Sequence, residues 1–146
     1  MSKLAQFGTA TALLGLVLAF MGLFPGTLGL DPTEGIGILQ IFVTLIGFAL
    51  LNMGAYIYAK DTWFRGKPQT LAQSIGVRLT LTGLLFAAAA GLADLLGFGS
   101  HPSGNTIRPL LGPWQAVGFV MGFWISTLGV AVFVIYGRWT DKNGED

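Results

Sequence analysis

The chain has 146 residues, of which 53% are hydrophobic and only 10% are charged. Soluble domains carry about 25% charged residues, so the composition argues against a water-soluble fold. The formal net charge of +1 gives no footprint for nucleic-acid binding, and the absence of cysteine excludes disulfides and thiolate metal sites.

Four stretches carry no charged residue, at 4–30, 35–59, 79–93 and 109–137. A helix needs roughly 20 apolar residues to cross a bilayer, and three of the stretches exceed this length. The third is shorter, but Arg78 can extend its side chain to the membrane interface and lengthen the usable span. The first is too long for the apolar region of a signal peptide, so an uncleaved helix is expected. We therefore predict an all-α integral membrane protein with four transmembrane helices, at 6–29, 36–58, 75–97 and 113–136.

The basic residues indicate the orientation in the membrane. Seven of the eight lie before the first helix, around the connection between the second and third, or after the fourth: Lys3, Lys60, Arg65, Lys67, Arg78, Arg138 and Lys142. In a four-helix chain these regions share one side, which the positive-inside rule assigns to the cytoplasm. Interfacial aromatic residues are expected there too, namely Tyr56, Tyr58, Trp63, Tyr136 and Trp139, with Trp114 at the opposite interface. We predict a plasma (inner) membrane protein with both termini cytoplasmic.

Two segments of the chain share a sparse pattern, GILQIFVTLIGFALLNMG at 37–54 and GPWQAVGFVMGFWISTLG at 112–129. The first helix has glycines at 8, 15, 22 and 29, and the third has glycines at 76, 83 and 97 with Ala90 in the remaining place. We interpret the chain as one membrane domain, 1–146, built from a duplicated helical hairpin. Repeat 1 covers 1–60, repeat 2 covers 71–138, and 139–146 form a cytoplasmic tail. Because both copies begin on the same side, the repeat is parallel, with its pseudo-twofold axis along the membrane normal.

Glycines seven residues apart return to nearly the same face of a helix and leave a smooth groove of backbone. Small residues in membrane helices let their backbones approach closely. We therefore predict helix packing through Gly8, Gly15, Gly22, Gly47, Gly54, Gly76, Gly83, Gly122 and Gly129. An alternative is that these grooves hold the tail of a lipid, carotenoid or chlorophyll. No motif predicts a cofactor, and close helix packing is the favoured interpretation.

Five polar residues are candidates for a role beyond solvation. Gln40 and Gln115 occupy equivalent first turns, where an amide caps backbone groups or tethers a loop, the alternative being a polar mouth or a ligand contact. Asn52 is expected to make an interhelical contact. Asp94, near the outer end of the third helix, is expected either to pair with Arg108 or to reach interfacial water.

The sequence shows no nucleophile–base pair, phosphate loop or paired-carboxylate site, and its only histidine, His101, lacks partners for a metal site. We therefore predict no enzymatic activity. The leading hypothesis is a non-catalytic accessory subunit that packs with lipids and other integral subunits in a larger membrane complex, such as a photosynthetic or respiratory energy-converting one. Two alternatives are a small homo-oligomeric transporter or channel, and a pigment-, quinone- or lipid-associated membrane protein.

Overall fold

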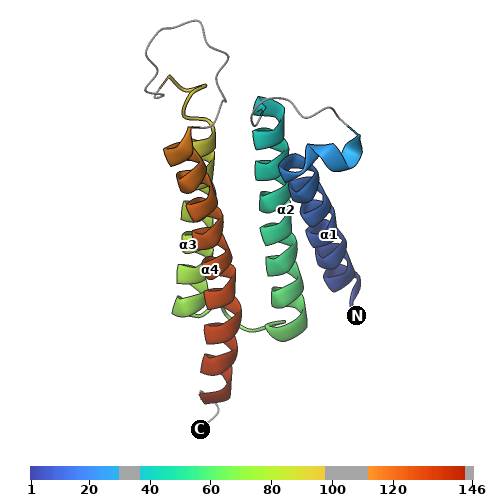
Figure 1. Cartoon of the computed structure of the whole chain (residues 1–146). Coiled ribbons are helices and arrows are strands. Elements are labelled where there is room, and N and C mark those ends of the chain that lie inside the picture. Colours follow the sequence, from blue (N-terminus) through green and yellow to red (C-terminus); the bar gives the residue numbers. More distant parts are fainter. Residues whose placement is uncertain (30–36, 98–111, 144–146) are drawn as a thin grey trace, which may run out of the picture.

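The computed structural model describes residues 1–29, 37–97 and 112–143, and it is all-helical there (Figure 1). The helices are α1 (Lys3–Leu23), α2 (Ile38–Trp63), α3 (Leu71–Gly91) and α4 (Pro113–Asn143), with a short 3₁₀ turn, η1 (Pro25–Leu28), after α1. Each of the four long helices is long and apolar enough to cross a membrane. The prediction of a multi-pass, four-helix membrane protein is confirmed for this part of the chain.

The N-termini of α1 and α3 are fixed by hydroxyl caps. Ser2 Oγ accepts a hydrogen bond from the backbone N–H of Ala5 at 3.0 Å. Thr70 Oγ1 accepts from the N–H of Gln73 at 3.2 Å, and Gln73 Oε1 accepts from the N–H of Thr70 at 3.0 Å, which completes a capping box. This box starts α3 at Leu71, four residues before the predicted start.

The predicted helix ends also need correction. The first helix ends at Leu23 rather than at 29, because Pro25 has no N–H to continue it and Gly29 adopts a left-handed φ of 69°. The third ends at Gly91 rather than at 97, and turns follow it up to Gly97, with a φ of 81°. The second and fourth helices run beyond their predicted ends, to Trp63 and Asn143.

The four helices form two hairpins, α1–α2 and α3–α4, that stand side by side (Figure 1). Contacts within each hairpin are far more extensive than those between them, and α2 makes most of the latter, with α3 and α4. α1 and α3 run in the same direction, and α2 and α4 run the opposite way. Four basic residues lie around the end that holds the N-terminus and the α2–α3 connection, which we call the basic end: Lys3, Lys60, Arg65 and Lys67.

Within the first hairpin the helices meet backbone to backbone at glycines. A Cβ atom placed on Gly15 would lie 2.5 Å from the carbonyl oxygen of Gly47 and 2.3 Å from the backbone nitrogen of Leu51. A Cβ atom placed on Gly8 would lie 3.0 Å from the carbonyl oxygen of Gly54. Larger side chains at these positions would therefore force the two helices apart.

The second hairpin is packed in the same manner. A Cβ atom on Gly83 would lie 2.6 Å from the carbonyl oxygen of Gly122, and one on Gly76 would lie 2.7 Å from that of Gly129. The partner helix thus fills the glycine grooves of both hairpins. At these glycine contacts no space remains between the two backbones for the tail of a lipid or a pigment.

The hairpins pack on each other through aromatic side chains. Phe48 of α2 and Phe123 of α4 stack with ring centroids 4.1 Å apart. Nearer the basic end, Phe133 of α4 makes T-shaped contacts with Tyr56 and Phe64, at centroid distances of 4.8 and 5.7 Å. Side chains form this second interface, whereas backbone forms the first, so the hairpins are held less closely than the helices within them.

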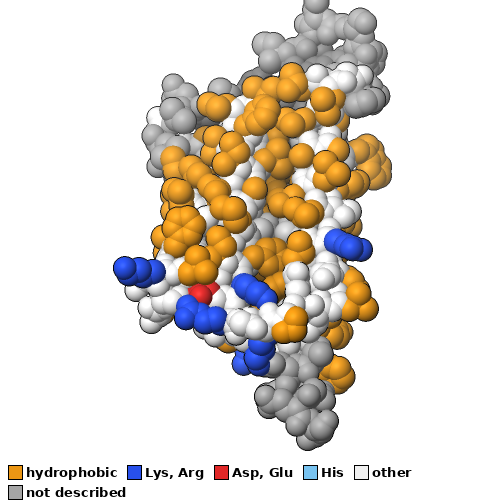
Figure 2. Space-filling model, turned by 180° about the vertical axis from the view of Figure 1, so that it is seen from behind, with side chains coloured by type: hydrophobic (Ala, Val, Ile, Leu, Met, Phe, Trp, Pro, Cys, Tyr) orange, Lys and Arg blue, Asp and Glu red, His pale blue; other side chains and the backbone are white. Residues whose placement is uncertain are grey.

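Large apolar side chains lie mostly on the outside, and small or polar ones lie inside. Figure 2 shows hydrophobic side chains over most of one face, with lysine and arginine gathered toward the basic end. Leu14 and Leu85 are more than half exposed, whereas Thr44, Thr80 and Ser126 are buried. Lipid is as apolar as leucine, so outward leucines cost nothing in a membrane, and the interior favours close packing.

The glycine contacts predict that Gly15→Leu and Gly83→Leu each lower thermal stability in detergent. Overpacking a close-packed interior costs about 1–3 kcal/mol, and backbone contact on the other helix allows little relief. Gly26→Leu is the control, because nothing lies within 4 Å of a Cβ added there. Thermal unfolding followed by circular dichroism measures the difference. Equal melting temperatures for Gly15→Leu and Gly26→Leu would contradict this packing.

Candidate functional site

A cluster of polar side chains lies where the two hairpins meet, with three members buried and Tyr56 partly buried. We call it the polar cluster: Asn52, Tyr56, Thr80 and Ser126. Asn52 Nδ2 of α2 donates to Ser126 Oγ of α4 at 3.0 Å and to the carbonyl oxygen of Phe48 at 2.9 Å. Thr80 Oγ1 of α3 donates to the carbonyl oxygen of Ser126 at 3.0 Å. The cluster therefore joins three helices at one level of the bundle.

The fourth member, Tyr56 of α2, links the network to α3. The hydroxyl of Tyr56 lies 2.6 Å from Thr80 Oγ1 and donates to the carbonyl oxygen of Gly76 at 3.2 Å. Asparagine, serine and threonine do not ionise at neutral pH, and phenols ionise only near pH 10. The arrangement is suited to holding helices together and supplies no base for proton transfer.

The two glutamines occupy matching positions at the opposite end of the bundle. Gln40 Oε1 accepts from the backbone N–H of Gly37 at 2.5 Å, and Gln115 Oε1 accepts from that of Gly112 at 2.6 Å. Both amides thus cap the first turn of their own helix. Gln115 Nε2 also donates to Asp94 Oδ1 at 2.7 Å, which ties the turn after α3 to the start of α4.

Asp94 therefore lies beyond the end of α3, in the turns that follow Gly91, and not inside the helix as predicted. Its proposed partner Arg108 and the lone His101 lie outside the described residues. The sequence did not pair Asp94 with Gln115, because the two are 21 positions apart and only Gln115 belongs to a helix.

The basic end has its own polar contacts. Ser2 Oγ donates to Asp61 Oδ2, which ties the start of α1 to the last turns of α2. Asp61 also pairs with Arg65, whose Nη2 lies 2.5 Å from Asp61 Oδ1. Gln73 is 1% exposed and its Nε2 has no hydrogen-bond partner. Arg138 lies over the ring of Trp63, 5.3 Å from its centroid, at a distance suited to a cation–π contact.

Of the polar cluster, the sequence singled out Asn52 but not the other three members. Tyr56 was expected at the membrane interface, but its hydroxyl is turned into the bundle. Thr127 stands at the repeat position equivalent to Asn52, but its hydroxyl donates to the carbonyl oxygen of Phe123 in its own helix, and Asn52 bonds to Ser126 instead. The spacing of small residues in the sequence could have indicated that Ser126 faces the interior. It stands four residues after Gly122 and three before Gly129, on the small-residue face of α4.

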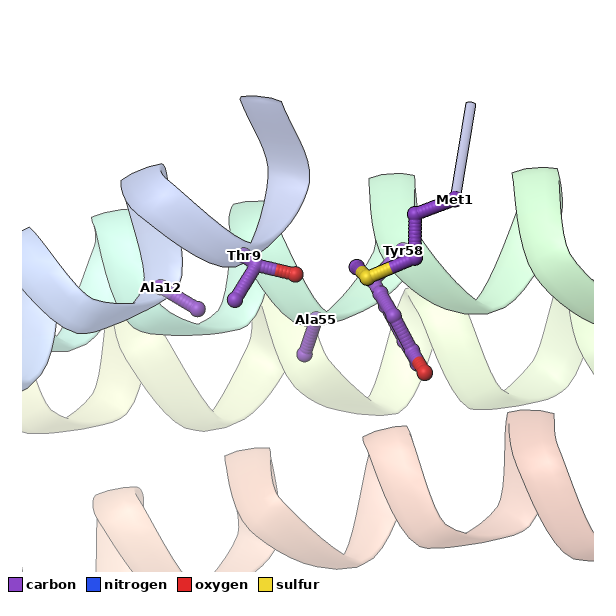
Figure 3. Close-up of a pocket in the computed structure, with 5 residues that line it drawn as sticks. All are labelled: Met1, Thr9, Ala12, Ala55 and Tyr58. Carbon is purple, nitrogen blue, oxygen red and sulfur yellow. The ribbon is translucent and has the colours of Figure 1, made fainter. Parts of the chain in front are cut away.

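The surface holds two kinds of hollow. One, of about 340 Å³, lies between α1 and α2 near the N-terminus; Figure 3 shows Met1 alongside Tyr58, with Thr9, Ala12 and Ala55 beside them. Thr9 Oγ1 donates to the carbonyl oxygen of Ala5, so its hydroxyl is satisfied within α1. The other kind lies between the hairpins.

In the described part of the chain, no three histidine, aspartate or glutamate side chains gather as metal ligands would.

No protein-family model matches the chain, and neither the curated proteins nor the solved structures include a match to it. Proposals about its function therefore rest on its own geometry.

The polar cluster predicts energetic coupling between Asn52 and Ser126. A double-mutant cycle of Asn52→Ala and Ser126→Ala, measured by unfolding in detergent, should give a coupling of about 0.5–2 kcal/mol, as for other interhelical hydrogen bonds in membranes. The matched control pairs Asn52→Ala with Thr127→Ala, whose hydroxyl bonds within its own helix. A coupling of zero for Asn52 and Ser126 would show that their hydrogen bond contributes nothing to stability.

Proposed function

We propose that the chain is a non-catalytic accessory subunit that packs against larger integral membrane proteins. This proposal rests on the exposed side chain of Trp124 and on its position along α4. Tryptophan in membrane helices gathers at the two interfaces, where its N–H reaches water or headgroups. Trp114 and Trp139 suit such interfacial positions, near the two ends of α4, and are 87% and 63% exposed.

Trp124 lies at a different depth. It is eleven residues after Pro113, so it stands about 16 Å along α4, near the middle of a hydrocarbon core about 30 Å thick. Its side chain is 61% exposed, and the described residues supply no hydrogen bond to its indole nitrogen. Lipid tails cannot accept this N–H, and an unpaired polar group in hydrocarbon is costly. A helix of another subunit, offering a carbonyl or hydroxyl, would satisfy it.

The polar cluster supports the same proposal from the inside of the bundle. Its hydrogen-bonding groups are used to join the chain's own helices, and none of its members titrates near neutral pH. A catalytic or ion-conducting site needs groups poised by burial and neighbours to exchange protons or ligands. The outward face of α4 is then the surface on which the role depends.

We further propose that the four helices arose from a duplicated hairpin. α1 and α3 each have 21 residues and are offset by 68 positions, and α2 and α4 begin 75 positions apart. The glycine contacts recur at the same offsets, because the contact of Gly15 with Gly47 in the first hairpin corresponds to that of Gly83 with Gly122 in the second. Equivalent copies should lose similar stability in Gly15→Leu and Gly83→Leu. A loss confined to one of them would contradict the proposal.

We also propose that the protein lies in the plasma membrane with its basic end on the cytoplasmic side. The fold supports it by gathering the N-terminus, the α2–α3 connection and the last turns of α4 at one end (Figure 1). Lys3, Lys60, Arg65 and Lys67 lie there, as the positive-inside rule requires of the cytoplasmic side.

Cysteine labelling tests this topology in a chain that has no native cysteine. In intact cells, Gln69→Cys in the α2–α3 connection should be shielded from a membrane-impermeant thiol reagent, and Thr33→Cys and Ser103→Cys should be labelled. Permeabilised cells control for reactivity, because all three should label there. Labelling of Gln69→Cys in intact cells would reverse the proposed orientation.

Photo-cross-linking tests the accessory role. With a benzophenone amino acid in place of Trp124, membranes irradiated before solubilisation should yield adducts to a larger integral membrane protein. Leu14, which lies mid-way along α1 and is 54% exposed, is the control position and should give lipid adducts. In mild detergent, Trp124→Leu should lose most of the co-purifying partner while the chain itself stays folded.

Other results would replace the accessory role with an alternative. Adducts only to a second copy of this chain would favour the homo-oligomeric transporter or channel. A visible chromophore in the purified protein, lost in Trp124→Leu, would favour a pigment-associated protein. Loss of a transport or redox activity in Asp94→Asn, with assembly intact, would show that the chain carries a functional site of its own.

A further inference from the structure

A long groove runs between the two hairpins on the side where α2 faces α3. It consists of two hollows of about 370 Å³ each that share Tyr56, Ile57 and Val77. In Figure 2 a recess between the hairpins is bordered by hydrophobic side chains, and basic side chains gather at its lower end. Unlike the glycine grooves, this space is not filled by the chain itself.

The walls of the groove are suited to hydrocarbon. Met53 and Ile57 of α2 face Val77, Leu81 and Leu84 of α3. Three members of the polar cluster, Asn52, Tyr56 and Thr80, also line it, but all three are already engaged in hydrogen bonds to neighbouring helices. A ring with carbonyl or hydroxyl groups, such as a quinone, would compete with these bonds, whereas a hydrocarbon chain would leave them intact.

The length of the groove corresponds to one leaflet. Its lining on α2 extends from Ala49 to Lys60, which is about 16 Å at 1.5 Å per residue. Half of a hydrocarbon core about 30 Å thick is roughly 15 Å. A single acyl chain inserted from the basic end would therefore reach the far end of the groove near the bilayer midplane.

The groove ends at a cation. Lys60 lines its mouth together with Gln69, and Lys60 Nζ donates to the carbonyl oxygen of Lys67 at 2.8 Å. An ammonium group has three N–H donors, so this bond orients the group and leaves two donors for a ligand. The neighbouring Asp61 is engaged by Ser2 and Arg65, and no carboxylate in the described part of the chain forms an ion pair with Lys60.

We propose that this groove is a binding site for one anionic phospholipid of the leaflet at the basic end. One acyl chain lies along Met53, Ile57 and Leu81, and the phosphate is held by Lys60. An apolar groove of leaflet length that ends at an ammonium with no ion pair among the described residues is complementary to an acyl chain bearing a negative headgroup. The site does not depend on the accessory role, since it is complete within one chain.

Native mass spectrometry of the delipidated, detergent-purified chain tests the site with two lipids of identical acyl chains, phosphatidylglycerol and phosphatidylcholine. We expect one tightly bound phosphatidylglycerol. Lys60→Gln should weaken its binding about fivefold and abolish the preference over phosphatidylcholine, which is the effect of one basic side chain near a headgroup. Lys60→Arg should keep the preference. Lys3→Gln, which removes a basic residue outside the groove, should change nothing.

A second pair of variants tests the acyl-chain position. Met53→Trp fills the groove and should weaken binding of both lipids, whereas Leu14→Trp, on the lipid-facing side of α1, should not. Circular dichroism confirms that each variant is folded. Equal affinity for the two lipids in the unmodified chain, or unchanged lipid binding in Met53→Trp, would overturn the proposal. So would cross-linking from Met53 in membranes to a protein instead of a lipid.

Discussion

The structure depends on the contact of glycine backbone with backbone inside each hairpin. In a membrane the hydrophobic effect does not drive helices together, because lipid tails are as apolar as the side chains. Close packing must supply the attraction, and it is greatest where no Cβ atom separates the helices. Gly15 on Gly47 and Gly83 on Gly122 provide such contacts near the middle of each hairpin. The large side chains are thereby displaced outward, where leucine and phenylalanine meet lipid at no cost.

The second interface follows from the first. With the glycine faces used within the hairpins, α2 meets α3 and α4 through bulkier residues, among them Phe48, Phe123 and Phe133. These cannot approach as closely, so specificity comes from hydrogen bonds such as that between Asn52 and Ser126. The looser fit leaves the groove that ends at Lys60. Strong pairing within hairpins and weaker pairing between them thus account for both the polar cluster and the groove.

The two proposed contacts with the surroundings lie on different elements. Trp124 points away from the bundle on α4 and presents an N–H at a depth where lipid cannot accept it. Lys60 presents a cation at the mouth of the α2–α3 groove. A partner helix on α4 and a phospholipid between α2 and α3 therefore do not compete for the same side chains. Both contacts use groups that the internal hydrogen bonds leave available.

Hydrophobic run length in the sequence determined the four membrane helices, because a bilayer requires long, uncharged segments. Helix ends depended on local chemistry that run length does not report: Pro25 shortened α1, and the capping box of Thr70 with Gln73 started α3 early. The spacing of the glycines indicated which faces are smooth, but only the tertiary structure showed that the helix next in sequence fills each of them. Likewise, Asn52 was recognisable as a polar residue in a span. Its bond to Ser126, and not to the adjacent Thr127, was decided by the rotation of α4, since adjacent residues on a helix face directions about 100° apart.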